Sequence, residues 1–247
     1  MPSKFSGFSR QMPAFFRGLE KNNSREWFTP RKDIFEQHVR QPMIQLATQV
    51  NDALRTFAVE HVVADPAKSL YRIYRDTRFS KDKTPYKTHV GITFHRSGLP
   101  KHAGAGYYFS VSHQEVEIAG GVYMPGSEEL AAIRTAIAAD PAGFLKVVNA
   151  PAIRKVMGPL LGEQLKRPPK DWQTCADSSA AEYLRFKQLY WYVTLPAKLA
   201  LGPKIAATVI DRFRILRPAM EWFNTAILAA RKQDEAESRP IRPAPMW

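Results

Sequence analysis

The sequence lacks three features that would assign it to a well-defined class of protein. A single cysteine, Cys175, among 247 residues excludes an intrachain disulfide. No continuous apolar run reaches the roughly 18 residues of a membrane-spanning helix. The N-terminal stretch MPSKFSGFSRQMPAFF has no unbroken apolar segment of the kind found in signal peptides. These absences predict a soluble protein of a reducing compartment, by default the cytoplasm, with no membrane partner.

Signatures of cofactor and metal binding are also missing. The sequence contains neither a Rossmann nor a P-loop glycine pattern, and no HxH or HExxH spacing. His89 and His95 would lie about 20 Å apart on one strand and could not share an ion. His95, His102 and His113 could converge only if their strands brought them together. We therefore expect neither a cofactor nor a metal site.

Positive charge is abundant and unevenly distributed. The formal net charge is +13. Residues 68–101 contain nine Lys or Arg side chains but only Asp76 and Asp82 as acids, an excess of seven positive charges and over half of the total. Concentrated positive charge attracts phosphates, nucleic acid or acidic proteins. A solvated surface on a basic protein is the simpler explanation.

Hydrophobic periodicity changes twice along the chain. Apolar residues at helical spacing predict a long helical region over 24–57, broken near Pro30 and Pro42. Asn23 and Glu26 form a capping-box pattern, and we expect Trp27 and Phe28 after it to pack against a sheet. Alternating patterns between 70 and 124 predict about four antiparallel strands, with one turn at His113 and Gln114.

Helical patterns return after residue 124. Ser127 and Asp140–Pro141 are typical helix starts, and further helices are expected over 180–189 and 203–230. The Pro-rich segment 233–247 predicts a disordered tail. Because helices flank the strands instead of alternating with them, we predict a single α+β domain over residues 1–232. Its antiparallel sheet (70–124) would be covered by the N- and C-terminal helices.

The segment YRIYRDTRFSKDKTPYKTHVGITF carries the strongest hint of a ligand. Pairing of Tyr71–Arg75 with Lys87–Phe94 leaves an eleven-residue connection, and ordered connections of that length are often functional. Arginine matches two anionic oxygens with its planar fork, whereas lysine acts as a point charge. We predict that the cationic groups of Arg75, Arg78, Lys83 and Lys87 meet at one anion, with Phe79 and Tyr86 as stacking surfaces. The candidate ligand-binding residues are Arg72, Arg75, Asp76, Arg78, Phe79, Lys83, Tyr86 and Lys87.

Three functions remain open from these residues. The preferred one is a module that binds a phosphate-bearing anion, a nucleotide or nucleic acid, through the basic hairpin 72–87. The second is an enzyme acting on such a substrate, with the same cations stabilising negative charge. The third is a protein-interaction domain in which Asp76 and Asp82 pair with the basic side chains and only stiffen the loop. The sequence shows no pair of nucleophile and base.

Several longer motifs resemble one known family. NNSREWF (22–28) and YRDTRFSKDKTPYK (74–87), together with GYYFSVS, GGVYMP and LKRPPKDW, are similar to an uncharacterised domain-of-unknown-function family of bacteria and fungi. The likeness extends from about Phe8 to Leu228. The resemblance implies a single α+β domain and implies no activity.

Overall fold

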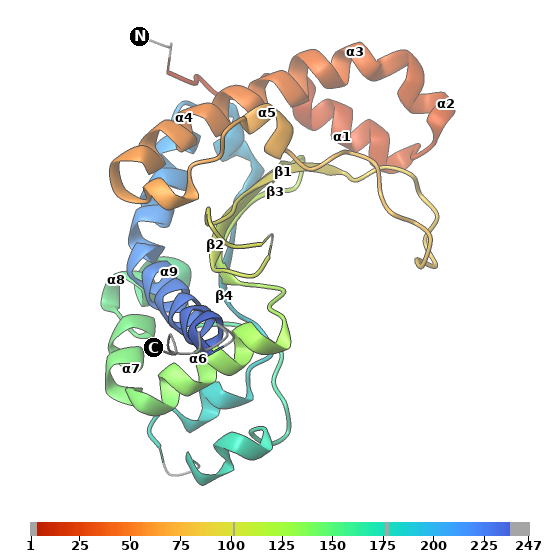
Figure 1. The fold of residues 1–247 in the computed structure, drawn as a ribbon. Coiled ribbons are helices and arrows are strands. Elements are labelled where there is room, and N and C mark those ends of the chain that lie inside the picture. The colour runs from red at the N-terminus through yellow and green to blue at the C-terminus, as the bar shows by residue number, and fades with distance from the viewer. Residues whose placement is uncertain (1–3, 101, 176–177, 238–247) are drawn as a thin grey trace, which may run out of the picture.

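A layer of short and long helices forms the first part of the chain (Figure 1). The structure is a computed structural model that describes residues 4–100, 102–175 and 178–237. Its N-terminal elements are α1 (Gln11–Lys21), α2 (Arg25–Phe28), η1 (Thr29–Arg31), α3 (Lys32–Phe35), η2 (Glu36–Arg40), α4 (Gln41–Phe57), η3 (Val59–His61) and α5 (Pro66–Ser69). The predicted interruptions are confirmed: Pro30 lies in the 3-10 turn η1, and Pro42 lies in the first turn of α4, where its missing N–H costs little.

A four-stranded antiparallel sheet forms the centre of the fold, and the predicted α+β class is confirmed. The strands are β1 (His89–Phe94), β2 (Gly106–Ser112), β3 (Glu115–Val122) and β4 (Leu189–Pro196), in the order β1-β2-β3-β4. The predicted turn at His113 and Gln114 joins β2 to β3, and the Ser112 hydroxyl accepts the N–H groups of Gln114 and Glu115. These two strands were predictable because their alternation and their turn are local features.

The predicted limits of the sheet were wrong at both ends. Residues 180–189 were expected to be helical, but a 3-10 turn η5 (Ala181–Arg185) leads into β4, which pairs with β3. Its sequence, LYWYVTLP, is rich in aromatic and β-branched residues, which favour strands. Conversely, no strand forms over Tyr71–Arg75: the isolated bridges there join Leu70 to Ile92 of β1 and Tyr74 to Tyr86. Pro85 has no N–H to donate there, which limits regular pairing.

The C-terminal helices cover the lower part of the sheet and return along it (Figure 1). They are α6 (Ser127–Ala139), α7 (Pro141–Val148), α8 (Pro151–Met157), the 3-10 segments η4 (Lys170–Cys175) and η6 (Ala197–Leu201), and α9 (Lys204–Glu237). Asp140 caps α7 as predicted, by accepting the N–H of Gly143 at 2.9 Å. Helix α9 continues into the segment predicted as a tail, and residues 238–247 lie outside the described residues. None of the described helices combines the length and apolar character needed to cross a bilayer.

The two faces of the sheet differ in what covers them. One face packs on α9, where the Phe213 ring lies 4.6 Å from that of Tyr107 and 5.9 Å from that of Phe94. Alternate residues of β2 and β3, including Phe109 and Ile118, are fully buried on this side. The opposite face carries Tyr108, Glu117 and Tyr192, which line a cavity. The alternation of the strands therefore separates a core face from a face available to a ligand.

Asn23 fastens the basic hairpin to the N-terminal helices. Its side-chain amide donates to the Tyr86 carbonyl at 2.9 Å and accepts the Tyr86 N–H at 3.0 Å. The Phe28 ring stacks on the Tyr86 ring at 4.3 Å. Because Asn23 is used in this way, Ser24 is the N-cap of α2, and its hydroxyl accepts the Trp27 N–H. The segments 22–28 and 74–87, far apart in sequence, thus form one structural unit.

The expected burial of Trp27 and Phe28 is met in part. Phe28 is 4% exposed and contacts Tyr86 as well as Phe15 of α1. Trp27 is half-buried and lies on α1, where its ring approaches Gly18 so closely that a Cβ there would stand 2.6 Å from it. The tryptophan therefore packs on α1, and its predicted contact with the sheet stays a prediction.

Asn23→Ala is expected to destabilise the protein by about 1–3 kcal/mol, because it leaves the part-buried N–H and C=O of Tyr86 without their partner. Urea unfolding would measure the loss. The matched control is Asn22→Ala, whose amide donates only to the exposed Gly18 carbonyl one turn back. Equal losses for the two variants would contradict the docking role of Asn23.

Candidate functional site

Two of the predicted anion-binding arginines are occupied by carboxylates of the same hairpin. Arg75 pairs with Asp82 and also donates to Thr84. Arg78 donates two hydrogen bonds to the Asp76 carboxylate, from Nε at 3.0 Å and from Nη2 at 2.8 Å. The Arg78 bonds lower the pKa of Asp76 to about 2. Both carboxylates are therefore ionised at neutral pH and offset the charges of Arg75 and Arg78.

Lys83 and the aromatic residues of the hairpin also have defined places. Lys83 Nζ donates to the Thr77 carbonyl at 2.9 Å and closes the loop. Phe79 is 95% exposed, with the Arg78 guanidinium 5.8 Å from its ring centroid. Tyr86 is 3% exposed, and its ring contacts Phe28 and Tyr74. The burial of Tyr86 makes it a core residue, so its ring offers no stacking surface to a ligand.

Arg72 and Lys87 differ from Arg75 and Arg78, which are paired with carboxylates. Neither forms an ion pair with a carboxylate in residues 4–100, 102–175 or 178–237. Lys87 is half-buried, with its ammonium 5.1 Å from the centroid of the Tyr71 ring. Burial lowers the pKa of Lys87, and the positive charge of Arg72 lowers it further. Two like charges therefore share one site without a counter-ion from the described part of the chain.

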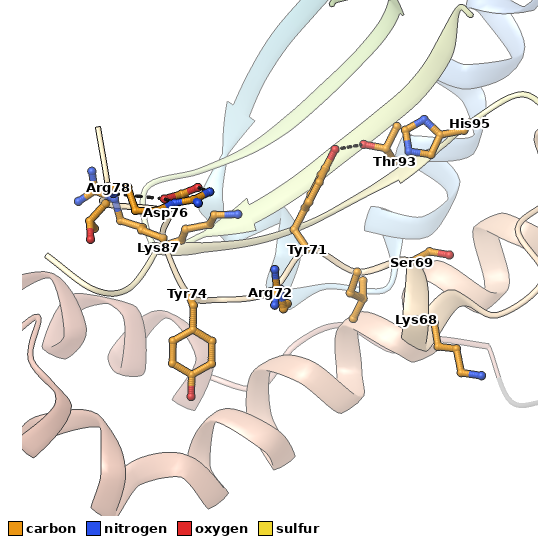
Figure 2. A pocket seen from close by; sticks show the side chains of 13 residues that line it. Lys68, Ser69, Tyr71, Arg72, Tyr74, Asp76, Arg78, Lys87, Thr93 and His95 are labelled. Carbon is orange, nitrogen blue, oxygen red and sulfur yellow. Dashed lines mark hydrogen bonds and ion pairs between the residues drawn. The ribbon is translucent and has the colours of Figure 1, made fainter. Parts of the chain in front are cut away.

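Both cations line an open groove of about 940 Å³ at the base of the hairpin. Figure 2 shows Lys87 between the Arg78–Asp76 pair and Tyr71, with Arg72 below Tyr71. Lys68 of α5 extends the groove, with its ammonium 3.9 Å from Asp65 across one helical turn. The remaining lining residues are Ser69, Leu70, Tyr74, Arg75, Thr77, Thr93 and His95. Of the four cations predicted to meet, Arg75, Arg78 and Lys87 line this space and Lys83 does not. Arg75 and Arg78 are paired with carboxylates, so Arg72 and Lys87 are the hairpin cations of this Arg72–Lys87 groove without a carboxylate partner among the described residues.

A second cavity, of about 380 Å³, lies on the open face of the sheet. Glu117 stands on β3 at its edge, and its carboxylate accepts hydrogen bonds from the hydroxyls of Ser110 and Tyr192. Burial and the neighbouring Glu117 raise the pKa of Tyr192, which keeps its hydroxyl protonated as the donor. Burial also raises the pKa of Tyr108 to about 12. This tyrosine cavity is lined mainly by Tyr108, Tyr123, Tyr190, Tyr192, Ala119 and Glu117.

Sequence reasoning missed this cavity for a specific reason. The register of β2 and β3 places Tyr108 and Glu117 on one face. A helix was expected over 180–189, so the strand that aligns Tyr190 and Tyr192 beside Glu117 was not predicted. The signal that was present is the strand-like alternation of LYWYVTLP.

Of the three candidate histidines, only His95 and His102 lie close together. The rings of His95 and His102 lie 5.2 Å apart, whereas His113 contacts Glu20 of α1 at 3.2 Å. In the part of the chain that the structure describes, no group of three or more His, Cys, Asp or Glu residues is arranged to hold a metal ion.

A comparison with models of protein families identifies the family of this chain. The model of a conserved hypothetical protein family, DUF2461, matches residues 11–222, which include the hairpin, the groove and the sheet. The chain belongs to the DUF2461 family. A search of curated proteins finds no match to this DUF2461 protein. Its function must therefore be argued from the groove and the cavity themselves.

Proposed function

We propose that this DUF2461 protein binds a phosphate-bearing anion, a nucleotide or nucleic acid, in the Arg72–Lys87 groove. The observation that carries the proposal is the pair of like charges for which the described residues supply no counter-ion. Holding two cations together disfavours their charged forms, and an anion between them removes that penalty. The planar guanidinium can contact two phosphate oxygens while the ammonium contacts a third.

The rest of the hairpin forms a frame that holds Arg72 and Lys87 in place. The Arg75–Asp82 and Arg78–Asp76 pairs hold the connection in one conformation, and Asn23 anchors its base. Arg72 and Lys87 lie on the two sides of that base, where the Lys87 N–H donates to the Ile73 carbonyl at 2.8 Å. A rigid frame reduces the ordering cost that a ligand must overcome.

A thermal-denaturation series with sodium phosphate, sulfate and chloride at constant ionic strength tests the proposal. Phosphate and sulfate are expected to raise the melting temperature in a saturable way, and chloride is not. By mass action, ligand at 100 times its Kd adds about 2.7 kcal/mol to the free energy of unfolding. If phosphate, sulfate and chloride act alike, the groove does not bind oxyanions and the proposal is wrong.

The stabilisation by sulfate should depend on pH through Lys87. Sulfate keeps its charge across the alkaline range, and burial holds the pKa of Lys87 below the ordinary value for a lysine. Lys87 is positive below its pKa, so the sulfate-induced rise in melting temperature should be constant near neutral pH. It should then shrink as the pH rises through that lowered pKa. Lys87→Arg should remove the alkaline decrease, because a guanidinium stays charged. A decrease that persists unchanged in Lys87→Arg would assign the titration to another group.

A further inference from the structure

The tyrosine cavity has the shape of a site for a flat ring. Its floor is formed by small residues of β2 and β3, Gly106, Ala119 and Gly121. Tyrosine side chains stand around that floor: Tyr192 is 36% exposed and Tyr123 is 59% exposed. Exposed aromatic rings on a sheet face can stack on the bases of nucleotides and do so with little dependence on base identity. A volume of about 380 Å³ is within the range of small-ligand sites.

Glu117 gives the cavity a negative charge, whereas the groove is positively charged. Its carboxylate accepts one hydrogen bond from Ser110 and one from Tyr192, and a carboxylate has about four acceptor positions. The remaining lone pairs can accept the amino or imino N–H groups of a base. A phosphate would be repelled here and attracted to Arg72 and Lys87. The two spaces therefore suit the two ends of one molecule.

The groove and the cavity are adjacent. Tyr71, Thr93 and His95 line both of them. Figure 2 shows Tyr71 between Lys87 and Thr93, with its hydroxyl 2.8 Å from the Thr93 hydroxyl. The Tyr71 ring centroid lies 5.1 Å from Lys87 Nζ on the groove side and 6.3 Å from the Tyr108 ring on the cavity side. A ligand that passes Tyr71 can therefore touch the groove cations and the cavity rings at once.

We infer that the groove and the cavity together bind one nucleoside phosphate. The phosphate lies at Arg72 and Lys87, the sugar passes Tyr71, and the base lies over Ala119 with its N–H donors toward Glu117. This inference rests on the proposed phosphate site and adds the ring-binding half. The same chemical unit occurs as a free mononucleotide and at the end of a nucleic-acid strand.

Titration calorimetry at fixed ionic strength tests the inference. The ligands are inorganic phosphate, the four nucleoside 5′-monophosphates, the matching nucleosides and a short single-stranded oligonucleotide with a terminal phosphate. At least one mononucleotide should bind 10-fold or more tightly than inorganic phosphate. Ala119→Leu, which fills the floor of the cavity, should reduce that affinity to the level of phosphate. Phosphate binding itself should be unchanged in this variant.

A second variant keeps the test decisive if Ala119→Leu destabilises the protein. If Ala119→Leu lowers the melting temperature strongly, Tyr192→Ala removes one wall of the cavity instead, at a side chain that is already 36% exposed. The same loss of nucleotide affinity, with phosphate binding retained, is expected. Nucleotide affinity that survives in both variants would overturn the inference.

The outcomes separate the inference from the proposed function. Mononucleotides that bind no more tightly than phosphate would overturn the ring site and leave the phosphate site standing. Nucleosides that bind while phosphate does not would overturn both the phosphate site and the single-ligand arrangement. A terminal-phosphate oligonucleotide that binds more tightly than any mononucleotide identifies a strand end as the source of the unit. Equal or weaker binding identifies the free nucleotide, and either result supports the inference.

Discussion

Replacing Arg72 by alanine and Lys87 by methionine is expected to abolish the stabilisation of this protein by phosphate. Each cation should contribute a charge-assisted contact of about 1.5–3 kcal/mol, so losing both lowers phosphate affinity by 100-fold or more, at about tenfold per 1.4 kcal/mol. Methionine keeps an apolar stem beside the Tyr71 ring, where the half-buried lysine chain lies. The measurement is the phosphate-dependent shift in melting temperature, compared with the native chain.

The control for this pair must remove the same net charge elsewhere. Lys146 of α7 and Lys155 of α8 are exposed and distant in sequence from the hairpin. Lys146→Ala with Lys155→Ala should leave the phosphate response intact. Without phosphate, the double variant with Arg72→Ala and Lys87→Met should have a free energy of unfolding within about 0.5 kcal/mol of that of the native protein. The reason is that the two substitutions remove no ion pair between described residues. If phosphate still protects this double variant fully, the anion binds outside the Arg72–Lys87 groove.

Phe213→Ala should destabilise the protein by about 3–5 kcal/mol, the range for a large aromatic removed from a packed core. The ring is fully buried between α9 and the sheet, in contact with Phe94, Tyr107 and Phe109. A typical domain has only about 5–15 kcal/mol of net stability, so the loss is a large share of the total. Denaturant unfolding monitored by tryptophan fluorescence would report it, since Trp191 and Trp222 lie in the same region.

The hairpin supplies a control with the identical substitution. Phe79 is 95% exposed, so Phe79→Ala should change the free energy of unfolding by no more than about 0.5 kcal/mol. If the two alanine variants lose similar stability, α9 does not pack on the sheet as described.

The location of the candidate site was predictable from the sequence, but the residues that form it were not. Charge density pointed to the hairpin, and Arg72 and Lys87 were both among the candidates. Sequence spacing could not show that Asp76 turns toward Arg78 and Asp82 toward Arg75, because those choices depend on how the loop folds. Nor could it show that Tyr86 points inward, because its burial comes from Phe28, 58 positions earlier in the chain.

What the sequence by itself determined is the local part of the fold. The β2–β3 hairpin, the Asp140 cap and the long C-terminal helix each follow from residue patterns within one element, and such patterns act over a few residues. Only the tertiary structure decided the partner of LYWYVTLP, whose composition already favours a strand, because β3, which pairs with it, lies far away in the chain. The same holds for Asn23, whose amide serves the backbone of Tyr86 and not its own helix. It holds also for the tyrosine cavity, which exists because β4 brings Tyr190 and Tyr192 beside Ala119 and Glu117, some 70 residues away in the chain.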